Sequence, residues 1–324
     1  MKTERVVVVT GAAGGIGRQI VKKFLDNGYF ACMLDIAEEP IEKAIAEMGF
    51  DGSKVKGYAI DISSEEKVKE VIARIIEDCG RIDALINAAG ICGKYAPTID
   101  YTFENFKRIY EINAFGTFLM MKYTLPQMVE QKKGAIVNFG SVSGMTGYTW
   151  EIGYGSSKWA VIGMTKNVAN EYGGMGIRAN SVSPGWVDTN MLKVSLDDFE
   201  AITGAADITL GPMGRVASPV EIANGVYWLC TDDASYVNST NLLIDGGMGI
   251  RANSVSPGWV DTNMLKVSLD DFEAITGAAD ITLGPMGRVA DPSEIANGVY
   301  WLCTDDASYV NSTNLLIDGG MMLG

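Results

Sequence analysis

The segment VVVVTGAAGGIG, residues 6–17, constrains the fold of this chain more than any other feature. Four consecutive valines that end at a glycine-rich turn are typical of a strand buried on both faces, as in a parallel sheet. The residues after the turn have helical spacing, with Ile16, Ile20 and Phe24 on one face, and the pattern ends at Gly28. A strand, a tight turn and a helix in this order predict the first unit of an α/β domain.

Strands and helices are predicted to alternate along most of the chain. Buried-strand patterns occur at 5–10, 30–34, 55–59, 82–86, 135–139, 179–182 and 242–244. Helical patterns occur at 16–27, 103–128 and 154–172, and Ser63-Ser64-Glu65-Glu66 predicts a capping box that opens a further helix. This alternation predicts right-handed βαβ units and a parallel sheet covered by helices on both faces.

The chain contains a long internal repeat. Residues 175–247 recur as residues 248–320, and the copies differ at two positions only, where Ser218 corresponds to Asp291 and Val220 to Ser293. One repetition of 73 residues is too long and too similar for a solenoid, and a recent duplication explains it more simply. Without one copy, 251 residues remain, which is a common size for a single α/β domain.

Composition excludes several classes of function. The 26 Lys and Arg residues against 40 Asp and Glu give a net charge of −14, which argues against nucleic acid or an anionic membrane as the main partner. The absence of histidine excludes Ser-His-Asp hydrolases, His-ligated zinc sites and dehydrogenases that use a histidine acid/base. Five scattered cysteines without a CxxC pair indicate reduced thiols and a cytoplasmic location.

Two features predict a dinucleotide site. The glycines between the first strand and the first helix allow a pyrophosphate to approach the positive end of that helix. Asp35 ends the second strand 18 residues after Gly17, where a carboxylate accepts both ribose hydroxyls and repels a 2′-phosphate. No Lys or Arg lies in the loop or just after Asp35, which favours NAD over NADP. An ordinary glycine-rich turn and a solvated strand-end Asp remain the simpler alternatives.

A third feature predicts acid/base chemistry. Tyr154 and Lys158 are four residues apart and share a helix face, so an ammonium group can lower the pKa of the phenol. Ser141 ends the fifth strand 13 residues upstream, where its hydroxyl can hydrogen-bond a carbonyl oxygen. A Tyr-x-x-x-Lys pair alone is equally typical of a surface contact between an aromatic ring and a cation.

In combination, these features resemble the short-chain dehydrogenase/reductase family over residues 5–247. The glycine pattern TGxxxGxG falls on Gly11, Gly15 and Gly17, and the family's NNAG motif is present as Asn87-Ala88-Ala89-Gly90. Its active-site tetrad corresponds to Asn113, Ser141, Tyr154 and Lys158. Its Asp after the third strand corresponds to Asp61, followed by Ile62, and its Pro-Gly stretch to Pro184-Gly185-Trp186-Val187-Asp188-Thr189.

The resemblance implies a Rossmann-type doubly wound parallel sheet and hydride transfer between NAD(H) and an alcohol or ketone, without a metal. Tyr154 would be the general acid/base, Lys158 would lower its pKa and hold the nicotinamide ribose, Ser141 would orient the substrate oxygen, and Asn113 would position a water. The residues expected to bind the cofactor are Gly11, Gly15, Ile16, Gly17, Asp35, Asp61, Ile62, Asn87, Ala88, Gly90, Tyr154, Lys158, Pro184, Gly185, Val187 and Thr189.

We therefore expect a single dehydrogenase domain at 1–247, with a cofactor half at 1–140 and a catalytic and substrate half at 141–247. Residues 248–324 would be an appended near-identical copy of its C-terminal third, followed by a short tail. The resemblance also implies a homo-oligomer, either a homotetramer or a dimer.

The substrate pocket is expected to be large and mostly apolar, with walls formed by Met145, Tyr148, Trp150, Trp186, Met191 and Leu192. Such walls favour a bulky neutral secondary alcohol, steroid-like or cyclic. The alternative for these side chains is a role in the core or in subunit contacts. The alternatives for the whole protein are a 3-oxoacyl-carrier-protein reductase, a non-catalytic dinucleotide-binding protein and an inactive product of the duplication.

Overall fold

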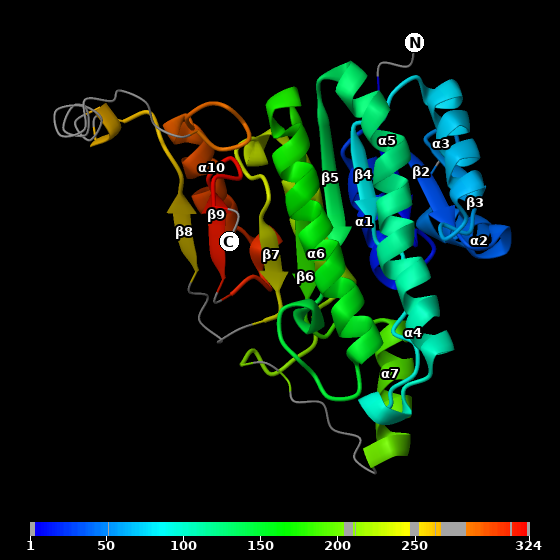
Figure 1. Cartoon of the computed structure of the whole chain (residues 1–324). Helices are drawn as coiled ribbons and strands as arrows, with labels where there is room; N and C mark the ends of the chain where they lie inside the picture. The colour runs from blue at the N-terminus through cyan, green and yellow to red at the C-terminus, as the bar shows by residue number, and fades with distance from the viewer. Residues whose placement is uncertain are drawn as a thin grey trace.

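A seven-stranded sheet in the order β3-β2-β1-β4-β5-β6-β7 forms the centre of the computed structural model (Figure 1). The structure describes residues 4–50, 52–203, 210, 212–246, 253–262, 264–266, 283–311 and 313–322. All neighbouring strands are parallel. The strands are β1 (Val6–Thr10), β2 (Phe30–Asp35), β3 (Val55–Ala59), β4 (Ala84–Asn87), β5 (Gly134–Phe139), β6 (Ile177–Pro184) and β7 (Asn241–Ile244). The predicted parallel, Rossmann-like α/β domain is confirmed.

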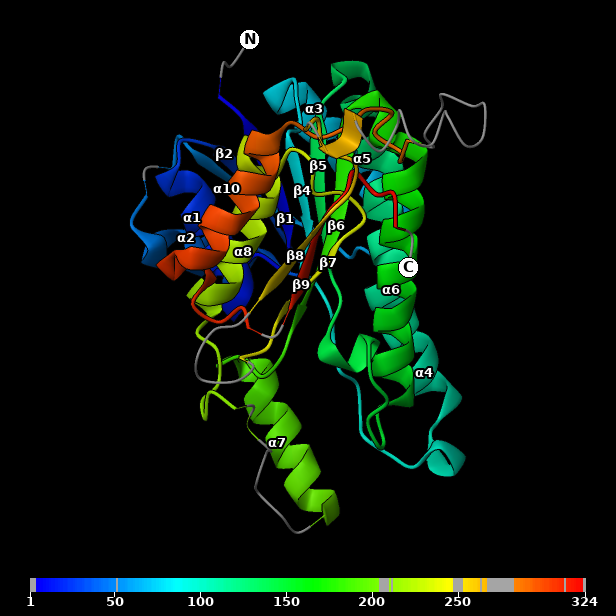
Figure 2. The ribbon, with the colours of Figure 1, turned by 90° about the vertical axis from the view of Figure 1, so that its left-hand side faces the viewer.

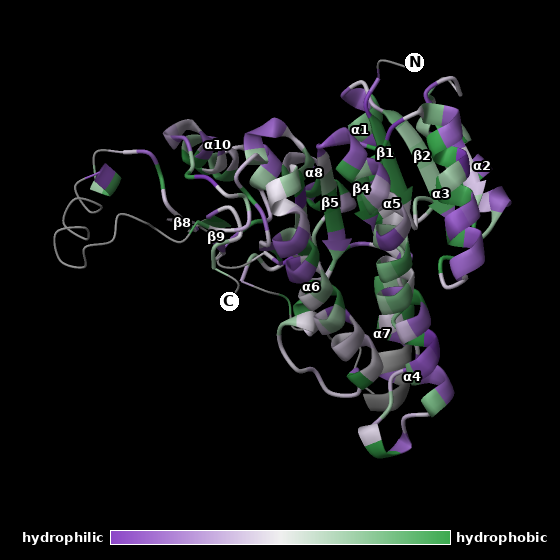
Figure 3. Ribbon diagram, turned by 45° about the horizontal axis from the view of Figure 1, so that its top comes forward, coloured by the Kyte–Doolittle hydropathy of each residue, from purple (hydrophilic) through white to green (hydrophobic). Residues whose placement is uncertain are grey.

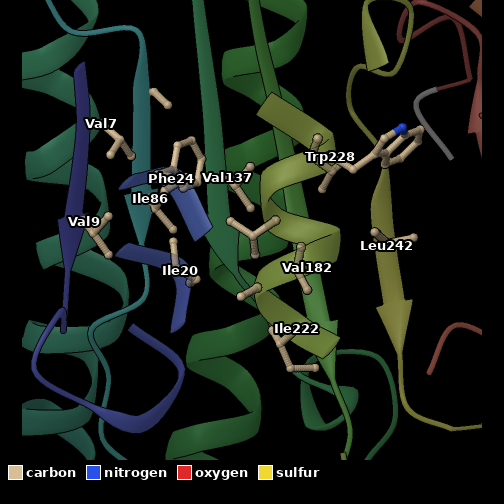
Figure 4. Packing of buried hydrophobic residues seen from close by; sticks show 14 of the residues in the cluster. Val7, Val9, Ile20, Phe24, Ile86, Val137, Val182, Ile222, Trp228 and Leu242 are labelled. Atoms are coloured by element: carbon tan, nitrogen blue, oxygen red, sulfur yellow. The ribbon is translucent and has the colours of Figure 1, made fainter. Parts of the chain in front are cut away.

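Helices cover both faces of this sheet (Figures 1 and 2). One face carries α1 (Gly15–Asp26), α2 (Glu38–Met48) and α8 (Pro219–Cys230), and the other carries α3 (Glu65–Cys79), α5 (Thr117–Gln131) and α6 (Ile152–Tyr172). The valines of β1 alternate between the two cores, because successive side chains of a strand point to opposite faces. Val7 and Val9 pack with α1 and α8, as Figure 4 shows, whereas Val6 and Val8 pack with α3 and α5.

Hydropathy follows this layering. In Figure 3 the strands of the sheet are mainly hydrophobic, and the outer turns of α2 and α3 are hydrophilic. Within the described ranges, no helix is both long enough and apolar enough to cross a membrane.

The structure corrects two details of the helix prediction. The helix predicted at 103–128 is interrupted, since α4 (Phe103–Tyr110) and α5 are separated by a π-turn at Glu111–Gly116. The capping box predicted at 63–66 is wrong: Ser64 is the N-cap residue of α3 but its side chain makes no capping bond, and the Ser63 hydroxyl instead donates to Asp61 Oδ1 at 2.6 Å. Helix α2 was not predicted, because its proline and its short length hide the periodicity.

The two copies of the repeat have different places in the fold. β6 and β7 of the first copy complete the central sheet. In the second copy, β8 (Ser254–Pro257) and β9 (Asn314–Ile317) form a separate two-stranded sheet, and α10 (Pro292–Cys303) lies beside α8 (Figure 2). The proposed domain boundary at 247/248 lies outside the described residues.

Candidate active site

Two connected hollows lie at the carboxyl ends of the central strands, where the strand order reverses between β1 and β4. The first, the long cleft, runs past the glycine loop, Asp35 and Asp61. The second, the inner cavity, lies between the ends of β5 and β6 and the start of α6. Five residues line both hollows and show that they are continuous: Ile16, Ala88, Gly90, Thr189 and Met191.

The glycine loop can adopt its shape only without side chains. Gly11 has a φ of +64°, and a Cβ on it would lie 2.8 Å from the Ala89 Cα of the neighbouring strand end. A Cβ on Gly17 would lie 2.1 Å from the carbonyl oxygen of Gly11. The loop therefore closes tightly against the first turn of α1, and the N-terminus of that helix faces the long cleft.

Asp35 lies at the end of β2 and lines the long cleft. Its carboxylate accepts hydrogen bonds from the backbone N–H groups of Ala13 at 2.9 Å and Ile36 at 2.8 Å, and is thereby held beside the glycine loop. Arg18 lines the same cleft and was missed by the sequence argument, which considered only the loop itself. Its Nε donates to the Ala13 carbonyl at 2.7 Å, and its guanidinium pairs with Glu47.

The remaining residues expected at the cofactor divide into two groups. Asp61, Ile62, Ala88 and Gly90 line the long cleft, and Pro184, Gly185 and Val187 line the inner cavity. The Ser63 hydroxyl lowers the pKa of Asp61, which keeps that carboxylate charged. Asn87 lines neither hollow in the described part of the chain. It is buried between strands, where its Nδ2 donates to Asn138 Oδ1 at 2.8 Å.

Tyr154, Lys158 and Ser141 meet in the inner cavity. The buried Lys158 Nζ donates to the carbonyl oxygen of Phe139 at 2.8 Å and lies 5.7 Å from the centre of the Tyr154 ring. Burial lowers the pKa of Lys158 to about 8. Burial also raises the pKa of Tyr154, while the Ser141 hydroxyl opposes this rise.

Asn113 lies in the π-turn and is almost completely buried. Its Oδ1 accepts from the Ile91 N–H at 2.9 Å, and its Nδ2 donates to the Ile91 carbonyl at 2.9 Å and to Ser157 Oγ at 3.1 Å. The side chain lines neither hollow among the described residues. It ties the segment after β4 to α6, and so positions Gly90, which lies between the two hollows.

Four of the six residues expected in the substrate pocket line the inner cavity: Tyr148, Trp186, Met191 and Leu192. Met145 and Trp150 are not among the described lining residues. Met145 is 42% exposed, and Trp150 has a φ of +66° in the loop before α6. Helix α7 (Asn190–Thr203) supplies the lining residues Met191, Leu192 and Ser195.

The inner cavity also has polar walls: Tyr95 and Ser195 lie in the segments 92–96 and 190–210 that were expected to line the pocket, whereas Ser143 and Glu151 were missed by the sequence argument. Glu151 precedes α6, and its Oε2 is buried without a hydrogen-bond partner in the described structure. Burial raises the pKa of Glu151. Its position three residues before Tyr154 is the one sequence signal that could have placed it here, since such residues are neighbours at a helix start.

Comparisons with known proteins agree with this arrangement. A family model described as enoyl-(acyl carrier protein) reductase matches residues 11–249 and matches a second time over 248–322. The chain belongs to the short-chain dehydrogenase/reductase family. Levodione reductase from Leifsonia aquatica is 38% identical over 252 residues, covering 76% of this chain and 94% of that protein.

Solved structures of this family include complexes with both nicotinamide cofactors. A xylitol dehydrogenase with bound NAD⁺ matches with a TM-score of 0.72 and 32% identity, covering 76% of this chain and all of that one. ElxO with bound NADP matches with a TM-score of 0.69 and 34% identity, covering 75% of this chain and 98% of that one. Members of the family similar to this chain therefore bind nicotinamide cofactors of both kinds.

Proposed function

We propose that this member of the family is an NAD(H)-dependent oxidoreductase that interconverts secondary alcohols and ketones. The observation that carries this proposal is the meeting of Tyr154, Lys158 and Ser141 in a cavity that opens directly into the long cleft. The cleft fits a dinucleotide, since it begins at a carboxylate, passes a helix N-terminus flanked by glycines and reaches Thr189, where it joins the inner cavity that contains Lys158. The bound nicotinamide would supply or accept the hydride.

The protein's own groups would manage the proton and the substrate oxygen. Tyr154, the general acid/base, donates the proton in ketone reduction and accepts it in alcohol oxidation. Lys158, held by the Phe139 carbonyl, contributes positive charge and hydrogen-bond donors beside the phenol and the cofactor ribose. Ser141 orients the substrate oxygen. Asn113 is a positioning residue in this proposal, in addition to the water-binding role implied by the family resemblance.

The cofactor is proposed to be NAD. Asp35 is fixed by two backbone N–H groups at the place where the adenosine ribose would lie, and its charge opposes a 2′-phosphate. The nearby cation, Arg18, is paired with Glu47, which offsets its attraction for a phosphate. No disulfide bond joins the five cysteines, all of which the structure describes, and this supports a cytoplasmic location.

The substrate is proposed to be a bulky, neutral, largely apolar alcohol or ketone, steroid-like or cyclic, with one additional polar group. The apolar surface comes from Tyr148, Trp186 and Met191. The unpaired Oε2 of Glu151 calls for a hydrogen-bond donor on the substrate, such as a second hydroxyl. A 3-oxoacyl-carrier-protein reductase is the second candidate, since a protein of that name from Thermotoga maritima is 34% identical over 246 residues. A non-catalytic dinucleotide-binding protein or an inactive duplication product would have no use for the converging Tyr154, Lys158 and Ser141.

The Tyr154→Phe variant tests the chemistry. We expect a loss of kcat of about 10²–10⁴-fold or more, because Phe preserves the packing but cannot exchange a proton. NAD binding, measured by fluorescence titration, should change little. The assay follows NADH absorbance with a panel of cyclic secondary alcohols and diols, and a 3-oxoacyl thioester as the competing substrate. Retention of most of kcat would contradict the proposed role of Tyr154.

A double substitution, Asp35→Ser with Ile36→Arg, tests the cofactor. The unmodified enzyme should prefer NAD over NADP by at least about tenfold in kcat/KM, since repulsion and desolvation at the 2′-phosphate are worth on the order of 1–3 kcal/mol. The double variant should erase or reverse that preference while the kcat with the better cofactor stays similar. Equal use of both cofactors by the unmodified enzyme would refute the proposal.

The proposed assembly is a homo-oligomer. Exposed aromatic side chains on and between α4 and α5 support a subunit contact there, as Phe103, Phe115 and Phe118 are 72%, 54% and 48% exposed. One such contact joins two subunits. The predicted homotetramer needs a second self-complementary face that joins two of these dimers.

A further inference from the structure

The second copy of the repeat packs on the first copy in a reciprocal manner. Trp228 of α8 and Trp301 of α10 occupy equivalent positions in the two copies, and their rings stack with centroids 4.1 Å apart and planes 7° apart. Both side chains are about 95% buried. Figure 4 shows Trp228 at the edge of the core cluster of the central sheet, so the stack extends this core to α10.

Hydrogen bonds around the tryptophan pair occur in matched sets. Ser235 Oγ donates to Glu294 Oε1 at 2.8 Å, and the equivalent Ser308 Oγ donates to Glu221 Oε1, also at 2.8 Å. The backbone repeats the pattern beside them. The Gly246 N–H donates to the Tyr309 carbonyl at 3.2 Å, and the equivalent Gly319 N–H donates to the Tyr236 carbonyl at 3.0 Å.

The buried tyrosines complete the pattern. The Tyr236 hydroxyl donates to the Arg288 carbonyl and the Tyr309 hydroxyl to the Arg215 carbonyl, each at 2.6 Å. Each guanidinium also lies over the opposite ring, with Arg215 at 4.7 Å from the Tyr309 centroid and Arg288 at 4.8 Å from that of Tyr236. Each of these contacts from the first copy to the second is thus matched by the same contact in reverse, whereas the bond from the Thr240 hydroxyl to the Leu316 carbonyl at 2.9 Å lies outside this matched set.

An interface in which both partners use the same surface patch, so that each contact occurs twice in opposite directions, is called isologous. Such a two-fold interface is normally formed by two identical subunits. Here the two partners belong to one chain. The two positions at which the copies differ, 218/291 and 220/293, are not among these contacts. In this chain, the second copy packs on one face of the first copy. The first copy of another chain presents the same residues, so it could pack on that face through the same contacts.

We propose that residues 283–311 and 313–322 act as a built-in substitute for a second subunit and cover the face formed by α8, β7 and residues 215–246. The full chain then does not pair with another chain through this face. A first copy released from its internal partner pairs with the same face of a second molecule. The proposal is independent of the catalytic activity.

The repeat itself provides a matched test in the full chain. Trp301→Ala with Tyr309→Ala, the second-copy variant, removes the internal contacts but leaves the face of the first copy intact. Adding Trp228→Ala and Tyr236→Ala to it gives the two-copy variant, which damages the equivalent face on both copies. We expect the second-copy variant to have twice the mass of the unmodified chain by light scattering at about 50 µM, and the two-copy variant to show no such doubling.

A gentler pair of variants covers the possibility that these variants do not fold. Ser308→Glu places a carboxylate against Glu221, and Ser235→Glu places one against Glu294, without removing apolar packing. Ser308→Glu should release the second copy and double the mass, whereas Ser235→Glu combined with Ser308→Glu leaves a carboxylate on the face of both copies and should not. Circular dichroism checks that each variant is folded. Equal masses for the two members of a pair, whether both doubled or both unchanged, would overturn the proposal.

Discussion

Residues 175–247 and 248–320 have almost the same sequence but different surroundings. β6 lies between β5 and β7 and is buried along its whole length, whereas β8 pairs only with β9 and is exposed or half-buried. The local structure is nevertheless the same. β8 and β9 pair in the register of β6 and β7, and both α8 and α10 begin with a capping box. The local sequence thus determines which helices and strands form. The segments packed around these helices and strands determine how far they are buried and what role they have in the fold.

The largest expected effect is a loss of free energy of unfolding, and it should differ between core substitutions in the first and in the second copy. Ile244 packs on Gly225 of α8 and the equivalent Ile317 on Gly298 of α10, and both side chains are fully buried. Ile244→Ala should lower the free energy of unfolding of the enzyme by about 2–5 kcal/mol, because it opens a cavity in the central core. Ile317→Ala should have a smaller effect on that transition, since it weakens only the docked copy.

The measurement is urea denaturation followed both by residual activity and by tryptophan fluorescence. The activity midpoint should move for Ile244→Ala and stay nearly constant for Ile317→Ala. Similar shifts of that midpoint in both variants would show that the second copy unfolds together with the catalytic domain, and would contradict a single complete domain at 1–247.

An intermediate effect is expected at the long cleft. The Thr189 hydroxyl accepts from the Leu192 N–H at 3.4 Å, and the equivalent Thr262 accepts from the Leu265 N–H at the same distance. Only Thr189 lines the long cleft and the inner cavity in the described structure. Thr189→Val should raise the KM for NAD about three- to tenfold, the effect of one hydrogen bond, and Thr262→Val should leave steady-state kinetics unchanged. An effect of equal size from Thr262→Val would assign a functional role to the second copy.

The smallest effect concerns a difference between the copies. Ser218 caps α8 by accepting from the Val220 N–H at 3.3 Å, and Asp291 caps α10 by accepting from the Ser293 N–H at 2.8 Å. Ser and Asp are comparable N-cap residues, so Ser218→Asp should change the free energy of unfolding by less than about 0.5 kcal/mol. Ser218→Ala serves as the control, with an expected loss of about 1 kcal/mol in thermal unfolding. A large loss for Ser218→Asp would indicate that the serine has a role other than capping.

The central sheet and the glycine loop could be predicted because both depend on short-range patterns. The valine run and the glycines of the first loop are contiguous, and their geometry follows from strand alternation and from steric limits at Gly11 and Gly17. The helix containing Asn113 could not be predicted in detail. A π-turn adds one residue per turn, and the apolar pattern on either side conceals the interruption.

The inner cavity was predicted less completely than the long cleft. Glu151 lies outside the motifs of the family resemblance, and only its spacing from Tyr154 relates it to the cavity. Met145 and Trp150 show the opposite error, because apolar side chains near Tyr154 were expected in the cavity. Backbone direction decides such cases, and the left-handed conformation at Trp150 is not encoded by a glycine or an asparagine.

The reciprocal packing of α8 against α10 has a consequence for how this surface responds to dilution. A contact between two separate subunits is lost as the protein concentration falls below the dissociation constant. Two segments joined in one chain instead meet at an effective concentration on the order of millimolar, whatever the number of molecules in solution. The fraction of molecules with Trp228 covered by Trp301 is therefore a property of each single chain, and it stays constant from nanomolar to micromolar protein.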